Sequence, residues 1–129
     1  MGGAIARGLA KGTIIQTADI CVSNPSKGKL DALKGEFPAM QVTHSNVEAV
    51  KEADIVLLAV KPWYIEPVIK ELPLDTEKQI LVSVAAGISF EQYEGWVGEK
   101  MPVFRVIPNT AISQLESMTL IASHHATKE

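Results

Sequence analysis

The sequence predicts an α/β fold built on a doubly wound, mostly parallel sheet. Short aliphatic runs alternate with helical segments along the whole chain, which is typical of strands joined by crossover helices. The clearest run, residues 55–60, is aliphatic throughout, as expected for a strand that helices cover on both faces. The chain also opens on Gly2-Gly3 followed by a helical pattern, which matches the second half of the strand, G-x-G-x-x-G, helix arrangement of dinucleotide-binding folds.

The first predicted elements are a helix over residues 2–11 and a strand over residues 18–23. Gly12 is a suitable end for the helix, whose apolar stripe has helical spacing: Ala4, Ile5, Leu9 and Ala10. Cys21 falls inside the strand, and we expect a buried, unreactive thiol there.

The next predicted elements are a helix, a strand and a second helix. Ser26 follows a turn and is placed to cap the helix over residues 27–36. A brief strand over residues 40–43 comes next. The helix over residues 45–53 begins at a serine, and Glu48 is placed to complete a capping box with it.

The remaining elements continue the alternation of strands and helices. Pro62 ends the strand over residues 54–60 and begins a helix that runs to about residue 72. Ser89 is placed to cap a helix that runs to Trp96. The other expected strands cover residues 79–84, 102–107 and 118–123, and the polar tail over residues 124–129 is expected to fray.

Bulk composition limits the class of protein. The chain has 129 residues, enough for a single domain with a core, and we expect residues 1–129 to form one. A net charge of −3 gives no electrostatic basis for binding nucleic acid or an anionic membrane. The longest apolar run is too short to span a membrane, and no secretory signal precedes the domain. One cysteine excludes an internal disulfide, so a cytoplasmic protein is expected.

Two segments in the first half of the chain are suited to a dinucleotide. Gly2-Gly3 at a helix N-terminus would let a pyrophosphate approach the backbone, although half a fingerprint is weak by itself and a flexible start to an amphipathic helix is the simpler explanation. The turn at residues 23–27 lies where NAD-preferring sites place an acidic residue, and none is present. Ser23, Asn24 and Ser26 offer hydrogen bonds and Lys27 a positive charge, which favours the 2′-phosphate of NADPH over NADH; an ordinary capped turn remains the alternative.

Three later segments follow strands whose carboxyl ends are expected at one edge of the sheet, where open α/β folds bind ligands. Small residues there would admit a flat ring, and polar ones would position a substrate. A solvated lysine, a packed Trp63 and ordinary turns are the simpler readings of each segment alone. The segments are Ala59-Val60-Lys61-Pro62-Trp63, Ala85-Ala86-Gly87 and Pro108-Asn109-Thr110.

Other polar residues suggest no chemistry. His44 fits a loop or cap position, and Asp54 fits a strand start. His124-His125 has no partner at metal-ligand spacing, so we expect no metal site. No nucleophile elbow and no complete phosphate loop is present.

Taken together, five segments resemble the N-terminal domain of pyrroline-5-carboxylate reductases, in that family's order and close to its spacing. The resemblance covers essentially the whole chain, and its later three segments are specific as a set. The segments are Met1 to Ala6, Val22-Ser23-Asn24, Ala59-Val60-Lys61-Pro62, Val84-Ala85-Ala86-Gly87-Ile88 and Arg105 to Thr110.

The resemblance implies reduction of Δ1-pyrroline-5-carboxylate to proline with NADPH, with NADH as the alternative. It implies a Rossmann-like domain followed by a helical dimerisation domain, and a homo-oligomer in the full-length protein. Met1 and Gly2 would lie at the pyrophosphate, and Ser23, Asn24 and Asn46 at the adenosine. Ala59, Val60, Lys61 and Pro62 would line the cofactor cleft, Ala86 and Gly87 would lie near the nicotinamide, and Asn109 and Thr110 would position the substrate. No catalytic residue is assigned.

Three departures from the family pattern qualify this interpretation. The first strand and first two glycines of the fingerprint are missing, Pro25 stands where many bacterial members have an arginine, and Ala111 replaces a proline. Without the first strand, two strand edges would lack partners, so we expect low stability or an exchange of strand or helix between chains. The chain alone is expected to be inactive. Two alternatives stay open: another Rossmann oxidoreductase, of the β-hydroxyacid dehydrogenase or F420-dependent NADP reductase type, or a non-catalytic nucleotide-binding fragment.

Overall fold

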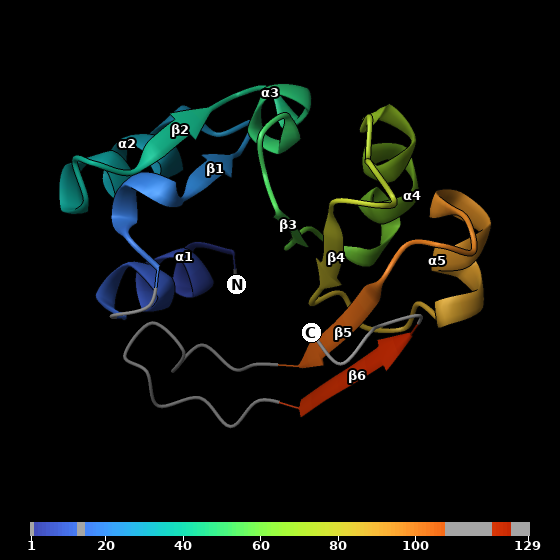
Figure 1. Cartoon of the computed structure of the whole chain (residues 1–129). Coiled ribbons are helices and arrows are strands. Elements are labelled where there is room, and N and C mark those ends of the chain that lie inside the picture. The colour runs from blue at the N-terminus through green and yellow to red at the C-terminus, as the bar shows by residue number, and fades with distance from the viewer. Residues whose placement is uncertain (1, 13–14, 108–119, 125–129) are drawn as a thin grey trace. The chain divides into compact units, whose positions relative to one another are not determined.

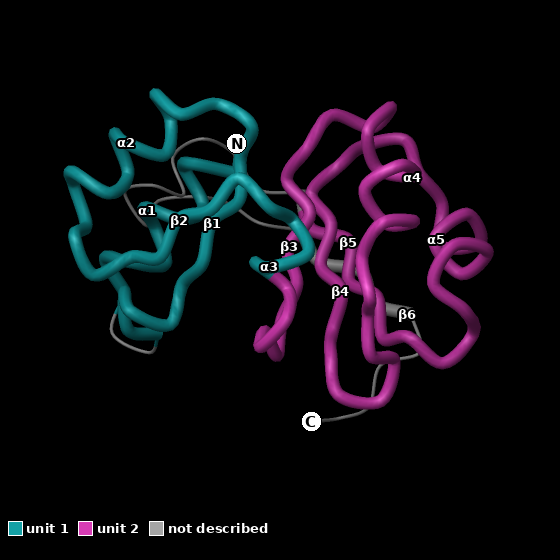
Figure 2. Tube along the Cα trace, turned by 90° about the horizontal axis from the view of Figure 1, so that it is seen from above, with its two compact units in different colours: residues 1–49, 109–118 teal, residues 50–108, 119–129 magenta. Residues whose placement is uncertain are grey.

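The computed structural model describes residues 2–12, 15–107 and 120–124, and within them it has the α/β architecture that the sequence predicts. The chain divides into two compact units, which Figure 2 colours separately: residues 1–49 with 109–118, and residues 50–108 with 119–129. Each unit is described by itself. That residues 1–129 form one domain remains a prediction.

Unit 1 is a two-stranded parallel sheet with its helices. Its elements are α1 (Gly2–Lys11), the 3₁₀ turn η1 (Thr17–Asp19), β1 (Cys21–Ser23), α2 (Lys27–Glu36), β2 (Gln41–Thr43) and α3 (Asn46–Val50), whose last residue is counted with unit 2. β1 pairs in parallel with β2, Val22 opposite Val42, so both strands point the same way (Figure 1). Ala6, Leu33 and Met40 form the buried core of this unit.

Unit 2 is a four-stranded mixed sheet with the order β3-β4-β5-β6. Its elements are β3 (Ile55–Leu58), α4 (Pro62–Glu71), β4 (Ile80–Ser83), α5 (Phe90–Val97), β5 (Val103–Ile107) and β6 (Leu120–His124). β3, β4 and β5 are parallel, and β6 is antiparallel to β5. Figure 1 shows α4 and α5 on the same side of this sheet, and the core joins them to it through Val56, Leu58, Ile65 and Tyr93.

Local signals explain where the helices begin and end. Pro62 opens α4 at the position where its missing N–H costs nothing. Ser89 caps α5 in a complete capping box with Gln92, and Gly98 ends that helix with a φ of +93°, which favours glycine. The predicted helix 27–36 is confirmed to the residue. Ser26 occupies its N-cap position, but the serine side chain accepts no capping hydrogen bond.

Several predicted elements are shorter than expected. The predicted strand 18–23 begins as η1, and only Cys21–Ser23 pair with β2. α3 ends at Val50, and its capping box is half formed, because Glu48 N–H donates to Ser45 Oγ at 3.3 Å while Ser45 N–H donates to Thr43 Oγ1. Residues 18–20 therefore precede the paired part of β1, and residues 51–53 follow the end of α3.

Three expectations about burial are wrong. Cys21 is exposed, because it lies at the start of a short strand with one strand neighbour. Ile55 and Leu57 are 55% and 37% exposed, because the unit 2 core takes only the alternate side chains of β3. In α1, Ile5 of the predicted stripe is buried, but Leu9 is exposed, and Ala6 and Gly8, outside that stripe, are buried.

One edge of β1 and one edge of β3 lack a strand partner in the part of the chain that the structure describes, as the sequence predicts. β1 is bonded to β2 alone, and β3 to β4 alone. Unpaired backbone N–H and C=O groups on such edges can pair with another strand.

Candidate functional site

Unit 2 brings two of the predicted segments to one sheet edge. Leu58 and Ser83 are register partners at the carboxyl ends of β3 and β4, and Val84 N–H donates to Leu58 O at 3.1 Å. The residues that follow each strand therefore start side by side: Ala59, Val60, Lys61 and Pro62 after β3, and Ala86 and Gly87 after β4. Asn109 and Thr110 lie outside the described residues.

This edge is open and lined by small or flat groups. Ala86 and Gly87 are exposed, and Gly87 has a φ of +80°, which a larger side chain would adopt only with strain. Lys61 occupies the N-cap position of α4, and its side chain makes no capping hydrogen bond. Trp63 and Tyr64 are 68% and 55% exposed, with ring centroids 6.0 Å apart, so Trp63 is not a packed core residue. The edge can accept a planar ring against small residues.

A buried polar pair supports the turn after β4, and sequence reasoning missed it. Ser83 Oγ and Tyr93 Oη, both fully buried, are 2.5 Å apart, and Ala85 N–H donates to Ser83 Oγ at 3.2 Å. Burial raises the pKa of the Tyr93 phenol, against smaller lowering effects of the hydrogen bond with Ser83 and the charge of Arg105. Ser83 ends β4 and Tyr93 lies in α5, and no pattern in the sequence predicts that these two side chains meet.

Arg105 lies on β5 and is the register partner of Ser83 on β4. Its guanidinium carbon lies 5.4 Å from the centre of the Phe90 ring, a cation–π distance. Its Nε is buried without a hydrogen-bond partner. The cation–π contact with Phe90 therefore helps to position the Arg105 guanidinium.

Unit 1 brings together the residues predicted for the adenosine side. Because β1 and β2 are parallel, the turn after β1 and the loop after β2 meet at one edge. The Ser23 hydroxyl donates to Asn46 Oδ1 at 2.6 Å, and Asn24 N–H donates to Thr43 O at 3.3 Å. Asn24 Oδ1 accepts from Ser26 N–H at 2.8 Å, which folds the turn back on itself.

The loop after β2 adds a residue that sequence reasoning set aside. His44 Nδ1 lies 2.9 Å from the carbonyl oxygen of Asn24, so this exposed imidazole bonds to the turn after β1. The contact follows from the register of the two strands: Ser23 and Thr43 are partners, so Asn24 and His44, the residues that follow them, lie side by side.

Positive charge gathers where α2 begins. Lys27 and Lys29 are exposed in the first turn of this helix, which contains no acidic residue. The helix dipole disfavours cations at this end by about 0.3–1 kcal/mol each. An anion bound there would offset this cost, and the Ser26 hydroxyl does not occupy the first amides as a cap.

Gly2 begins α1, which an ion pair attaches to α2. The Arg7 guanidinium donates to both carboxylate oxygens of Glu36, at 2.9 and 3.1 Å. This hydrogen-bonded pairing lowers the pKa of Glu36 and raises that of Arg7. The first turn of α1 has no acidic side chain. Met1 lies outside the described residues.

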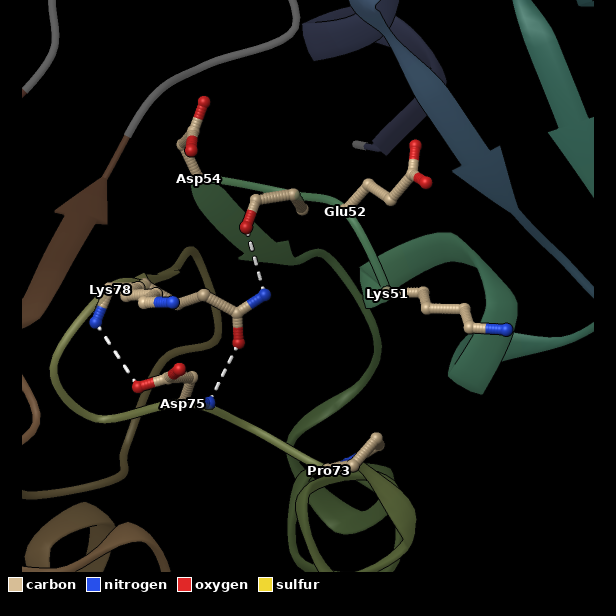
Figure 3. Close-up of a pocket in the computed structure, with 8 residues that line it drawn as sticks. Lys51, Glu52, Asp54, Pro73, Asp75 and Lys78 are labelled. Carbon is tan, nitrogen blue, oxygen red and sulfur yellow. Dashed lines mark hydrogen bonds between the residues drawn. The ribbon is translucent and has the colours of Figure 1, made fainter.

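A cavity of about 390 Å³ lies elsewhere, at the amino ends of β3 and β4 (Figure 3). None of the predicted site residues lines it. Its rim mixes both signs of charge around Gln79, which ties the neighbouring loops together. The lining residues are Lys51, Glu52, Ala53, Asp54, Pro73, Asp75, Lys78 and Gln79.

Within the described ranges, no cluster of three or more His, Cys, Asp or Glu side chains is placed to hold a metal ion. Among the helices that the structure describes, none is long and apolar enough to cross a membrane.

Comparison with known proteins points to one group of enzymes. Residues 1–87 match the family model described as NADP oxidoreductase, coenzyme F420-dependent. The chain is 41% identical over 97 residues to a pyrroline-5-carboxylate reductase of Pseudomonas aeruginosa, covering 74% of this chain and 35% of that protein. It is 36% identical over 130 residues to the mouse pyrroline-5-carboxylate reductase 3, covering 98% of this chain and 46% of that protein. The chain thus spans less than half the length of these relatives.

Solved structures agree with the sequence relatives. The Plasmodium falciparum pyrroline carboxylate reductase with NADP bound superposes with a TM-score of 0.84 at 26% identity, over 99% of this chain and 46% of that one. The Coxiella burnetii pyrroline-5-carboxylate reductase gives a TM-score of 0.81 at 28% identity, over 98% and 47%. These neighbours are Rossmann-like, which confirms the predicted fold class.

Proposed function

The chain belongs to the family of coenzyme F420-dependent NADP oxidoreductases, and we propose that it is the nucleotide-binding part of a pyrroline-5-carboxylate reductase. The full reaction would be reduction of Δ1-pyrroline-5-carboxylate to proline, with NADPH as the reductant. The names of the sequence and structure relatives support this assignment and do not favour another Rossmann oxidoreductase.

The observation that carries the choice of NADPH is the start of α2. Two lysines occupy a helix end that disfavours cations, beside a turn of Ser23 and Asn24 with no carboxylate. A carboxylate would bind the two ribose hydroxyls of NADH and repel a 2′-phosphate. Lysines, uncapped amides and a hydroxyl are suited instead to a phosphate dianion, so the residues present fit this cofactor.

We assign the adenosine end to unit 1. Ser23, Asn24 and Asn46 would hold the ribose and its phosphate, and Gly2 at the start of α1 would approach the pyrophosphate. The Ser23 proton is engaged by Asn46 Oδ1, so donation to a phosphate requires the Asn46 amide to present its nitrogen to Ser23 instead. Met1 belongs to this assignment by resemblance.

We assign the nicotinamide end to the carboxyl edge of unit 2. The bound nicotinamide supplies the hydride. Ala86 and Gly87 would leave room for the flat ring, and Ala59, Val60, Lys61 and Pro62 would line its approach. Asn109 and Thr110 stay proposed as substrate-positioning residues, and no proton donor is assigned.

We also propose a cytoplasmic location and a homo-oligomeric full-length enzyme. The single cysteine supports the first, because it requires no oxidising compartment. The unpaired edges of β1 and β3 support association of this chain with a second strand.

The test is a titration of the chain with NADPH and with NADH, followed by nucleotide fluorescence. We expect tighter binding of NADPH, and we expect Lys27→Gln and Lys29→Gln each to weaken it about two- to fivefold, as exposed charges near a phosphate do. NADH binding should stay within about twofold. Lys100→Gln, which removes an exposed lysine from unit 2, is the matched control.

The outcomes separate the proposals. Equal affinity for the two nucleotides would reject recognition of the 2′-phosphate. Binding of neither would reject the nucleotide-binding role of this chain. Binding without turnover of pyrroline-5-carboxylate would favour a non-catalytic nucleotide-binding fragment over autonomous catalysis.

A further inference from the structure

We infer that His44 is a positioning residue for the 2′-phosphate, acting through the turn after β1. This inference rests on the proposed function. It adds to the nucleotide site a residue that lies outside the five family-like segments. His44 lies between β2 and α3, and its imidazole reaches across to the turn that carries Ser23 and Asn24.

The chemistry of the contact defines the state of the ring. A backbone carbonyl can only accept a hydrogen bond, so His44 Nδ1 must carry the hydrogen in its 2.9 Å contact with Asn24 O. In the neutral ring this selects the tautomer with Nδ1 protonated and Nε2 as acceptor. The bond survives protonation of the ring, because Nδ1 is a donor in both states.

The bond completes a frame around Asn24. Its N–H donates to Thr43 O at 3.3 Å, its C=O accepts from His44, and its side-chain oxygen accepts from Ser26 N–H at 2.8 Å. The two backbone groups of Asn24 are thus bonded to consecutive residues: Thr43, the last residue of β2, and His44, the first residue after it. The neighbouring Ser23 is bonded to Asn46, the first residue of α3.

The frame sets the shape of the proposed phosphate site. The side chains of Ser23 and Asn24 reach a 2′-phosphate only if the turn keeps the path that leads into α2. The Asn24 to Thr43 bond is long, so the imidazole contact is the shorter of the two backbone attachments. Without it, the turn would sample other paths, and the phosphate would meet a less ordered set of donors.

His44 can be tested apart from folding because it is exposed and not a member of the unit 1 core. Its removal deletes one solvent-accessible hydrogen bond and no apolar contact of that core. We therefore expect the effect to fall on nucleotide selectivity and not on the melting temperature.

The experiment compares wild type, His44→Ala and His44→Asn in titrations with NADPH and with NADH. The asparagine amide can place an N–H close to the position of Nδ1, so it is the conservative variant. We expect His44→Ala to weaken NADPH binding about three- to tenfold, to change NADH binding less than about twofold, and His44→Asn to recover at least half of the loss. Gln41→Ala is the matched control, because Gln41 is an exposed residue of β2 whose side chain bonds to Ala18 O, away from the turn.

Three results would overturn the inference: an unchanged NADPH to NADH ratio in His44→Ala, equal weakening of both nucleotides with a lower melting temperature, or no recovery in His44→Asn. A wild type that fails to distinguish the nucleotides would reject the proposed function, and the role of His44 with it. Should His44→Ala fail to fold, nitrogen NMR of the wild-type imidazole decides: Nδ1 protonation supports the contact, and a predominant Nε2-protonated tautomer refutes it.

Discussion

Replacing Gln79 by leucine should lower the free energy of unfolding of unit 2 by more than a replacement by leucine at an exposed position would. Gln79 is 7% exposed. Its Nε2 donates to the carbonyl oxygens of Val50 and Ala53, both at 2.8 Å, and its Oε1 accepts from Asp75 N–H at 2.9 Å. One side chain therefore ties the segment before β3 to the segment before β4.

The magnitude follows from these three bonds. Each contributes about 1 kcal/mol net, and leucine leaves three main-chain groups without that partner. The residue lines an open cavity (Figure 3), so water can reach some of these groups, and we expect a loss of about 2–3 kcal/mol. For a unit of this size that corresponds to a fall in melting temperature of about 10–20 °C.

The assay is urea unfolding followed by tryptophan fluorescence. Trp63 and Trp96 are the two tryptophans of the chain, and both lie in unit 2, so the signal reports this unit. Lys100→Leu is the control, because it changes an exposed residue of the same unit and should cost less than about 0.5 kcal/mol.

Gln79→Glu sharpens the test. It keeps an acceptor for Asp75 N–H but turns an oxygen toward the two carbonyls. At neutral pH it should destabilise at least as much as leucine. A free energy of unfolding within about 1 kcal/mol of wild type for Gln79→Leu would refute the claim that this side chain joins the two segments.

Four further predictions concern stability, reactivity and association. The pKa of Glu36 is lowered chiefly by its hydrogen bond to Arg7, so the pair stabilises the folded protein at pH values above the ordinary glutamate pKa. That stabilisation is lost as the pH falls through the lower pKa of the folded state. The difference in free energy of unfolding between wild type and Glu36→Gln should therefore shrink on acidification, and a difference that does not change with pH would contradict this. Tyr93→Phe should cost about 1 kcal/mol, measured by urea unfolding, because Ser83 loses one buried partner and keeps Ala85 N–H; no change would refute a contribution from this pair. Cys21 should react with a maleimide because the residue is exposed, yet more slowly than free cysteine at neutral pH, since partial burial of the thiol, and next the charge of Glu48, raise its pKa; a rate equal to that of free cysteine would contradict this. Light scattering after size exclusion should show concentration-dependent association through the free edges of β1 and β3, and a monomer at all concentrations would argue against it.

The sequence predicted best what depends on neighbours along the chain. Helix 27–36 was assigned to the residue, and the helix after Ser89 has the predicted cap, because capping residues and helical spacing act over one or two turns. The family resemblance placed Ser23, Asn24 and Asn46 together at the adenosine side. In the structure Ser23 bonds to Asn46, because the parallel strands β1 and β2 bring their carboxyl ends together.

The errors concern burial, which depends on what covers a strand. An aliphatic run such as residues 55–60 looks the same whether one face or both are covered, so the exposure of Ile55 and Leu57 could not be read from it. Cys21 was expected to be buried for the same reason. Asn109 and Thr110 remain predictions, because they lie outside the described residues.

Local propensity and residue type were enough to predict the alternation of strands and helices, the cap at Ser89 and the order of the family-like segments. Only the tertiary structure brought His44 to the Asn24 carbonyl, Tyr93 to Ser83, and Gln79 to two loops. Each of these contacts joins polar groups that are far apart in the chain or on different elements. A hydrogen bond requires its two groups within about 3 Å, and the packing of the elements decides which pairs meet.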